Sequence, residues 1–367
     1  MADKASLVLE DGTVFEGEAF GAATETIGEV VFNTSMTGYQ EILTDPSYAG
    51  QIVVPTYPLI GNYGINDDDS ESRQVQVKGF VVREHCELPS HWQSRKTLHE
   101  FLESQGIPGV SGVDTRAITR RLRSRGVMMG AIARDEMVDE ALERLKTGPR
   151  YGELDHVSAV TTRQAYSWNE ETSATDSKLE IVVIDLGVKY NILRILESKG
   201  CRVKAIPSWA TAEAVLANDP DGVLLSPGPG DPAMLDYAVD MARSLIGTVP
   251  VMGICLGHQV LGRALGASTY KLKFGHRGGN HPVRDLSTGR IHITAQNHGY
   301  SIDAASMPSN TVITHINLND ETVEGFRHTE EPVLAIQYHS EGSPGPQDNV
   351  AMFDQFLEMA RDWKGQA

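Results

Sequence analysis

The sequence contains few cysteines, and they are not arranged in pairs. Cys86, Cys201 and Cys255 are an odd number in a chain of 367 residues, and none belongs to a C-x-x-C segment. A disulfide framework needs an even, repeated set of cysteines, and a structural zinc site needs clustered ones. We therefore expect neither kind of protein, and the composition fits a reducing compartment.

Long apolar runs and an excess of positive charge are also missing. No run approaches the ~18 residues that a membrane-spanning helix needs, and the N-terminal segment lacks the apolar stretch of a signal peptide. The chain has 32 lysine and arginine residues against 49 aspartate and glutamate residues, a net charge of −17. Because nucleic-acid binding depends on cationic contacts with phosphates, we expect a cytoplasmic protein that binds neither nucleic acid nor a membrane.

The sequence has two halves with different patterns. Residues 1–150 mix short β-like runs with helical stretches, and alternating apolar residues around Asp11-Gly12 predict a hairpin. Residues 151–178 lose this periodicity and predict a linker, polar and rich in serine and threonine. Residues 179–367 contain four apolar strands that alternate with amphipathic helices, the pattern of a parallel sheet covered on both faces. The predicted fold class is α/β, with a mixed α/β N-terminal domain followed by an open α/β sheet.

One cysteine lies in a segment that favours catalysis. In GICLG (253–257) an apolar strand ends and a helical pattern begins at once, so Cys255 is the thiol counterpart of the serine in a G-x-S-x-G turn. The helix N-terminus favours the thiolate, which is the attacking species, and the N–H of Leu256 points to where an oxyanion would form. The alternative is a buried, inert cysteine at the end of a strand. Cys86 and Cys201 have no comparable setting.

A catalytic thiol needs a base, and VLAIQYHSE (333–341) offers one. The apolar run leads to His339, and Glu341 follows two residues later. If strand geometry continues, both side chains point the same way, so the carboxylate can accept from the imidazole and fix its tautomer. Cys255, His339 and Glu341 then form a nucleophile, a base and an orienting group. An ordinary surface histidine and glutamate are the alternative.

Two other segments suggest binding sites of a different kind. LLSPGPGDPAM (224–234) superficially matches a dinucleotide-binding pattern, but its prolines remove N–H donors and Asp231 would repel a pyrophosphate. The segment fits a loop that presents its backbone to a small substrate, or a simple turn, better than it fits the dinucleotide-binding loop of a dehydrogenase. FGHRGGNHPV (274–283) has two histidines five residues apart and no cysteine or carboxylate partner nearby, so no metal site is predicted.

The segments GPGDP, GICLGHQ and Y-H-S-E together resemble the class I glutamine amidotransferases, over residues 179–363. The resemblance implies a flavodoxin-like open α/β sheet with Cys255, His339 and Glu341 as its catalytic residues. This family usually has a proline between its histidine and its glutamate. The chain has Ser340 there, which removes a constraint on φ and leaves the position of the carboxylate less firmly fixed.

The first half is similar to the N-terminal domain of the carbamoyl-phosphate synthetase small-subunit family. FNTSMTGYQEIL (32–43) and GVDTRAITRRLR (112–123) carry this similarity, and IDLGVKYNILR (184–194) and AQNHGYSID (295–303) resemble the same family. The resemblance implies that L-glutamine is hydrolysed through a cysteine thioester. It further implies contacts of glutamine with Ser35, Gly228, Gly230, Leu256, Gln259, Asn297, Gly299 and Tyr300.

The same resemblance implies a partner. Ammonia would pass to a large synthetase subunit, which makes carbamoyl phosphate from bicarbonate and ATP for arginine biosynthesis, pyrimidine biosynthesis or both. No cofactor is expected in this chain, because it has no G-x-x-x-x-G-K-[ST] segment, and ATP and Mg²⁺ are expected on the large subunit. The arginines at positions 116, 120, 121 and 123 fit either a docking surface for that subunit or a solvated helix face.

Two other classes of function remain open on the sequence. A stand-alone γ-glutamyl thiol hydrolase would use the same three catalytic residues and would not need the first domain. A non-catalytic scaffold would keep the glutaminase fold without its chemistry, although all three residue types are present. Reaction of Cys255 with a glutamine-analogue electrophile, and a requirement for a partner, separate these alternatives.

Overall fold

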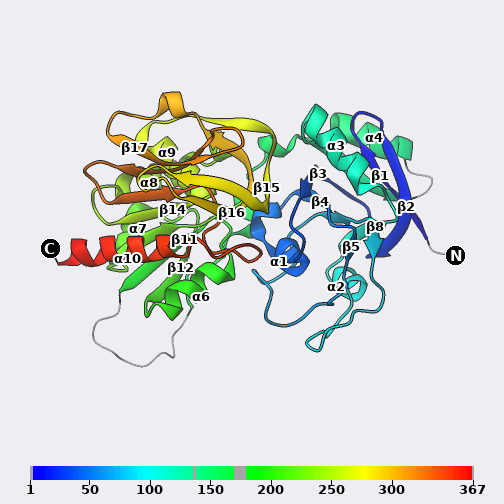
Figure 1. Ribbon diagram of the computed structural model, residues 1–367, viewed down its shortest axis with the longest axis horizontal. Coiled ribbons are helices and arrows are strands. Elements are labelled where there is room, and N and C mark those ends of the chain that lie inside the picture. The colour runs from blue at the N-terminus through cyan, green and yellow to red at the C-terminus, as the bar shows by residue number, and fades with distance from the viewer. Residues whose placement is uncertain (1–2, 135–137, 169–178, 366–367) are drawn as a thin grey trace. The chain divides into compact units, whose positions relative to one another are not determined.

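The structure is a computed structural model that describes residues 3–134, 138–168 and 179–365 (Figure 1). Strands and helices occur throughout these three ranges, as expected for the α/β class. None of the helices in them combines the length and the apolarity that a membrane crossing needs.

The chain folds into two compact units. The first contains the described residues up to Leu154 together with Lys273–Gly278, so a short segment from late in the sequence belongs to it. The second contains Asp155–Leu272 and the described residues from Gly279 onward.

The first unit is built on a seven-stranded sheet that closes on itself, in the order β1-β2-β8-β6-β4-β3-β9. The predicted hairpin at Asp11-Gly12 is confirmed, because β1 and β2 pair antiparallel with Val8 opposite Val14. Gly12 has the positive φ of 83° that a tight turn requires. The strands of this unit, including the separate pair β5 and β7, are β1 (Lys4–Leu9), β2 (Val14–Gly21), β3 (Thr26–Asn33), β4 (Gln51–Pro55), β5 (Leu59–Ile60), β6 (Gly79–Val81), β7 (Glu84–His85), β8 (Pro108–Ser111) and β9 (Met128–Arg134).

Helix α3 (Thr115–Arg125) shows how local sequence defines an element of this unit. Asp114 caps the helix by accepting a hydrogen bond from the N–H of Ala117 at 2.9 Å, and Gly126 ends it with a φ of 103°. The buried side of the helix carries Ile118 and Leu122. The other helices are α1 (Tyr39–Thr44), α2 (Leu98–Ser104), α4 (Val138–Thr147) and the 3₁₀ turns η1 (Pro46–Tyr48) and η2 (Tyr151–Glu153).

The second unit contains a ten-stranded sheet in the order β10-β12-β11-β13-β14-β19-β18-β17-β15-β16. The four predicted apolar strands are confirmed as β11, β12, β13 and β14, and a fifth parallel strand, β19, pairs with β14. Strands β17 and β18 continue the sheet in antiparallel pairs. The strands are β10 (Tyr166–Ser167), β11 (Glu180–Asp185), β12 (Arg202–Pro207), β13 (Gly222–Leu225), β14 (Val251–Ile254), β15 (Thr269–Asp285), β16 (Ile291–Ile302), β17 (Thr311–Asn317), β18 (Val323–His328) and β19 (Val333–Ile336).

Helices cover both faces of the parallel strands, as Figure 1 shows. Leu193 of α6 and Phe356 of α10 pack on one face, whereas Val215 of α7, Leu245 of α8 and Val260 of α9 pack on the other. This burial on both sides explains why the central strands are apolar along their whole length. The helices are α5 (Val157–Val160), α6 (Tyr190–Ser198), α7 (Ala212–Leu216), α8 (Asp236–Leu245), α9 (Leu256–Leu265), α10 (Ala351–Lys364) and the 3₁₀ turns η3 (Pro232–Met234) and η4 (Ala304–Ser306).

The segment 151–178, predicted as a linker, is only partly described. Residues 151–168 form short elements rather than an extended connection, and Tyr151 and Val157 are buried. Thr162 donates its backbone N–H to the carboxylate of Asp185 at 2.7 Å. The remainder of the predicted linker, 169–178, lies outside the described residues.

Candidate active site

Cys255 lies on the turn between β14 and α9, at the carboxyl edge of the parallel strands. Its φ is 53°, in the left-handed region that residues other than glycine seldom adopt. The turn is held in place because the backbone N–H of Cys255 donates to the carbonyl of Ile336, in the neighbouring strand, at 2.9 Å. Backbone strain of this kind recurs where a nucleophile is presented at a strand-to-helix turn.

The two glycines that flank Cys255 allow very close packing of backbone. A Cβ atom on Gly257 would lie 2.2 Å from the carbonyl oxygen of Leu225, and one on Gly253 would lie 2.6 Å from the backbone of Gly257. No side chain fits in either position without a shift of the main chain. The second glycine is therefore required by the contact of this turn with the end of β13, and the first by the contact of β14 with the start of α9.

His339 and Glu341 meet in a turn rather than along a strand. Strand β19 ends at Ile336, so the predicted continuation of the strand to His339 is wrong. The Nδ1 atom of His339 nevertheless lies 2.6 Å from Oε1 of Glu341, and the imidazole donates to the carboxylate. The backbone N–H of His339 bonds to the carbonyl of Ala295 at 2.9 Å, which anchors the turn. Ser340, where proline is usual, is accommodated in the same turn and is buried.

The His339–Glu341 pair is buried next to the thiol of Cys255. Burial by itself lowers the pKa of His339, but the Glu341 carboxylate and the Cys255 thiol outweigh it and raise the pKa well above its ordinary value. The Nδ1 atom is used by Glu341, so Nε2 is the ring nitrogen left for proton exchange. The Cys255 thiol also lies 3.6 Å from the carbonyl oxygen of Asn297.

Lys189, at the start of α6, is a component of the site that the sequence reasoning missed. Its Nζ lies 3.1 Å from Oε1 of Glu341 and also donates to the carbonyl of Gly342. Burial by itself raises the pKa of Glu341, but the Lys189 ammonium and then the His339 imidazole lower it to about 2. Asn191 adds a hydrogen bond to the carbonyl of Glu341 at 2.6 Å. The carboxylate is thus fixed from two sides.

The GPGDP loop lies against the Cys255 turn. A Cβ atom on Gly228 would lie 2.2 Å from the carbonyl oxygen of Leu186 and 2.8 Å from a side-chain carbon of Leu256. Gly230, two residues on, has a φ of 97°, and a Cβ atom there would meet nothing closer than 3.7 Å. Since Leu256 opens α9, its N–H is among those that the helix does not use. The N–H of Leu256 and the loop of Gly228 and Gly230, which are the predicted donors to the oxyanion, therefore lie next to each other.

The other predicted glutamine contacts are placed in different ways. Gln259 is buried, and its side-chain amide donates to the carbonyl of Tyr300 at 2.8 Å and to Gln337 at 2.9 Å. Asn297, Gly299 and Tyr300 lie within a stretch of four residues on β16, which includes the carbonyl that Gln259 contacts. Ser35 belongs to the first unit, where its backbone N–H bonds to Asn33 at 2.7 Å. The contacts of all these residues with glutamine remain predictions.

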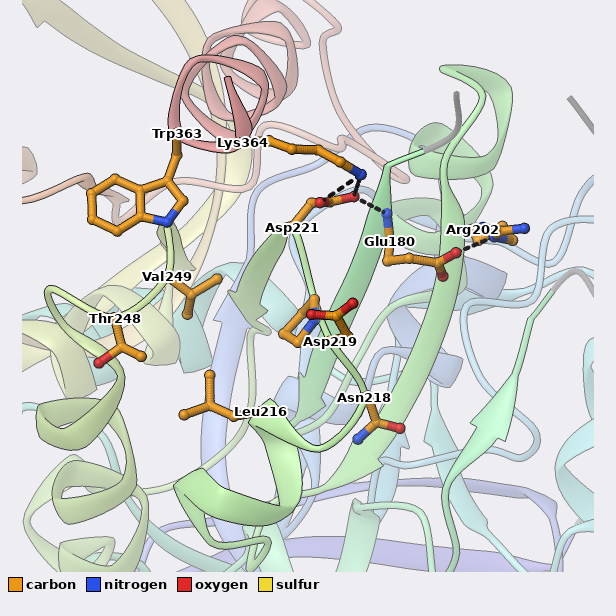
Figure 2. Close-up of a pocket in the computed structure, with 11 residues that line it drawn as sticks. Glu180, Arg202, Leu216, Asn218, Asp219, Asp221, Thr248, Val249, Trp363 and Lys364 are labelled. Atoms are coloured by element: carbon orange, nitrogen blue, oxygen red, sulfur yellow. Dashed lines mark hydrogen bonds and ion pairs between the residues drawn. The ribbon is translucent and has the colours of Figure 1, made fainter. Parts of the chain in front are cut away.

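A cavity of about 680 Å³ lies at the opposite, amino edge of the same sheet (Figure 2). Lys364 pairs there with Asp221 at 2.9 Å, and Arg202 pairs with Glu180. In Figure 2 the ring of Trp363, at the end of α10, lies on the side of Lys364 and Asp221 that faces away from Arg202. None of the predicted catalytic or glutamine-binding residues lines this cavity. The candidate active site is therefore the carboxyl edge, as expected for an open α/β sheet.

Comparison with known proteins agrees with this arrangement. The open parallel sheet belongs to the class I glutamine amidotransferases: the family model "Glutamine amidotransferase class-I" matches residues 182–359, a range that includes Cys255, His339 and Glu341. The model "Carbamoyl-phosphate synthase small chain, CPSase domain" matches residues 7–132.

Relatives of similar length identify the family more closely. The chain is 50% identical over 368 residues to a carbamoyl phosphate synthase small chain of Staphylococcus epidermidis, covering 99% of this chain and 98% of that protein. It is 51% identical to the small chain of Bacillus caldolyticus, covering 98% and 97%. It is 50% identical to the pyrimidine-specific small chain of Bacillus subtilis, covering 97% and 96%. The chain belongs to the carbamoyl-phosphate synthase small chain family.

Proposed function

We propose that the chain is the glutamine-hydrolysing subunit of carbamoyl-phosphate synthase. It releases ammonia from L-glutamine and delivers it to a large subunit, where bicarbonate and ATP are used with Mg²⁺. The observation that carries the proposal is the buried contact of His339 with Glu341 beside Cys255, on a turn with a positive φ. Family membership over the whole chain supports the assignment to this enzyme rather than to a free-standing hydrolase.

The first half of the reaction is proposed to form a thioester. The proton of the Cys255 thiol is held at Nε2 of His339, whose pKa is raised, and the thiolate attacks the side-chain carbonyl carbon of glutamine. The N–H of Leu256 and the adjacent glycine loop stabilise the oxyanion. His339 then gives its proton to the leaving nitrogen, the C–N bond breaks, and ammonia departs.

The second half is proposed to free the sulfur of Cys255 from the thioester. Water loses a proton to His339, and the resulting hydroxide attacks the thioester carbon. The C–S bond breaks, glutamate is released, and the sulfur of Cys255 leaves as the thiolate beside the protonated His339. Throughout, Glu341 holds the imidazole by its Nδ1–H, and Lys189 holds Glu341 in place.

The test compares glutamine with free ammonia as the nitrogen source in the complete complex. We expect Cys255→Ser to abolish carbamoyl phosphate synthesis from glutamine and to leave synthesis from ammonia intact. A glutamine-analogue electrophile should label the wild-type chain at Cys255 and leave Cys86 and Cys201 unlabelled. Unchanged glutamine turnover in the variant would refute the assignment.

The wider setting is part of the same proposal. The acidic composition and the scarcity of cysteine support a cytoplasmic enzyme. A pyrimidine-specific protein is among its relatives, so carbamoyl phosphate made with this subunit would supply pyrimidine biosynthesis, arginine biosynthesis or both. The chain itself is proposed to need no cofactor, because every step above uses its own side chains and backbone.

A further inference from the structure

Helix α3 in the first unit has an unusual concentration of one charge. Five of its eleven residues are arginine, and none is aspartate or glutamate. The chain as a whole carries a net charge of −17, so the helix differs sharply from the average composition. Its buried side is occupied by Ile118 and Leu122, and its arginines lie on the remaining surface.

Only some of these arginines make contacts that stabilise the first unit. Arg121 pairs with Asp11 at 2.6 Å, and the guanidinium of Arg123 lies over the ring of Phe274 at 5.9 Å. Arg116 and Arg120 are exposed, and neither forms an ion pair with any residue that the structure describes. At 100° per residue, Arg116, Arg120 and Arg123 lie within about 60° of one another around the helix. We call these three residues the arginine face.

Helix energetics do not explain the arginine face either. Cations near a helix C-terminus are favourable, which suits Arg123 and Arg125. Arg116 lies in the first turn, where the helix dipole disfavours a cation, and Arg120 follows it at i+4, where like charges repel. Neither the helix dipole nor pairing within the helix therefore accounts for Arg116 and Arg120, which form no ion pair with a described residue.

The fold adds a fourth cation beside this face. Lys273 comes from the short segment that joins the first unit from late in the sequence, and its side chain is exposed. Its carbonyl accepts a hydrogen bond from the N–H of Val127 at 2.9 Å, directly after the end of α3. Phe274, beneath the guanidinium of Arg123, is the next residue. A positive surface is thus assembled from two distant parts of the chain.

We propose that the arginine face, with Lys273, is a docking surface for a patch of carboxylates on the large synthetase subunit. This inference rests on the proposed function, which supplies the partner. A protein is favoured over a nucleic acid because the net charge of −17 repels a polyanion at long range, whereas a local acidic patch feels chiefly these few cations. Guanidinium groups suit such a patch because each can bind a carboxylate with two parallel hydrogen bonds.

The experiment measures association of the full-length chain with the purified large subunit at low and at high salt. We expect the double variant Arg116→Glu/Arg120→Glu to associate roughly tenfold more slowly at low salt, with a smaller difference at high salt. Arg125→Glu is the matched control, since Arg125 is exposed on the same helix but lies about 140–180° away from the arginine face. We expect it to associate at the wild-type rate.

A second variant and a second readout keep the test decisive. Arg116→Gln/Arg120→Gln removes the two charges but keeps good helix formers, so we expect an association rate between those of the wild-type chain and the glutamate variant. This variant tests the proposal even if Arg116→Glu/Arg120→Glu fails to fold. Association of both double variants at the wild-type rate would overturn the proposal. So would salt-dependent binding of a single-stranded oligonucleotide that these variants lose while they still bind the large subunit normally.

Labelling of Cys255 by a glutamine analogue separates this proposal from the proposed function. We expect every α3 variant to be labelled like the wild-type chain in isolation. Normal labelling with unaltered association would count against the docking surface alone. A wild-type chain that is not labelled, or that does not associate with the large subunit, would count against the proposed function and would remove the docking partner with it.

Discussion

The two edges of the parallel sheet in the second unit carry the same kind of ion pair in opposite surroundings. At the carboxyl edge, the side chains of Lys189 and Glu341 are 3% and 0% exposed. At the amino edge, those of Lys364 and Asp221 are 57% and 11% exposed (Figure 2). Breaking a buried pair leaves a desolvated charge without a partner, whereas water replaces a lost partner at the surface.

The burial of the carboxyl-edge pair changes the pKa values of its neighbours in the active site. Glu341 stays ionised although it is buried, because Lys189 and His339 hold its pKa low. The ionised carboxylate in turn raises the pKa of His339 beside Cys255. The amino-edge pair also touches a neighbour, the backbone N–H of Glu180, but its cation lies at the surface. Because the Lys189–Glu341 pair is buried, its carboxylate stays ionised and keeps the imidazole of His339 protonated.

The largest expected effect comes from removing the buried cation. Lys189→Met leaves the Glu341 carboxylate buried without it, and we expect unfolding free energy to fall by about 3–5 kcal/mol. Glu341 then becomes easier to protonate, so the loss should be smaller at acidic pH than at neutral pH. Urea unfolding at several pH values measures both effects. A loss no greater than that of Lys364→Met at the amino edge would contradict the comparison.

A smaller loss is expected where the backbone packs most closely. Gly257→Ala places a Cβ atom 2.2 Å from the carbonyl oxygen of Leu225, and relief of this contact requires movement of the Cys255 turn. We expect a cost of about 1–3 kcal/mol and reduced labelling of Cys255 by a glutamine analogue. Gly365→Ala, after the end of α10, is the control, because its Cβ would meet nothing closer than 3.5 Å. Normal labelling of Gly257→Ala would show that the turn adapts without losing its geometry.

Local sequence predicted the elements that depend on neighbouring residues. The G-x-C-x-G spacing marked the Cys255 turn because its glycines are needed within a few residues of the cysteine. The four apolar strands identified the parallel sheet because burial on both faces leaves a continuous apolar run. Likewise, Asp11-Gly12 marked a hairpin whose two strands adjoin the turn.

Features that depend on distant residues were not accessible in this way. Lys189 reaches Glu341 from another part of the chain, and nothing in its own surroundings distinguishes it from a surface lysine. His339 meets Glu341 because a turn, bridged to Ala295, replaces the expected strand. The closed sheet of the first unit rests on pairings such as β3 with β9, which alternation along one strand does not specify.

The next prediction concerns pH rather than stability. Glu341→Gln keeps the size of the side chain but removes the carboxylate that most strongly opposes the effect of burial on His339. The imidazolium should then lose its proton at a lower pH, so the alkaline limb of the kcat/KM profile for glutamine should move toward neutral pH. The profile is measured on the complete complex, with Glu180→Gln at the amino edge as the control. A reduced rate with an unmoved limb would mean that Glu341 acts on something other than this proton.

The smallest effect should come from the exposed pair. Lys364→Met removes the partner of Asp221, but water reaches the ammonium and the backbone N–H of Glu180 still donates to the carboxylate at 2.9 Å. We expect a change of about 0–1 kcal/mol in unfolding free energy that shrinks as salt is added, and unchanged hydrolysis of glutamine. A loss as large as that of Lys189→Met, insensitive to salt, would mean that the amino edge is as well shielded from water as the active site. In that case burial would not be what separates the two edges, and the special role of Lys189 would have to come from its contact with Glu341 alone.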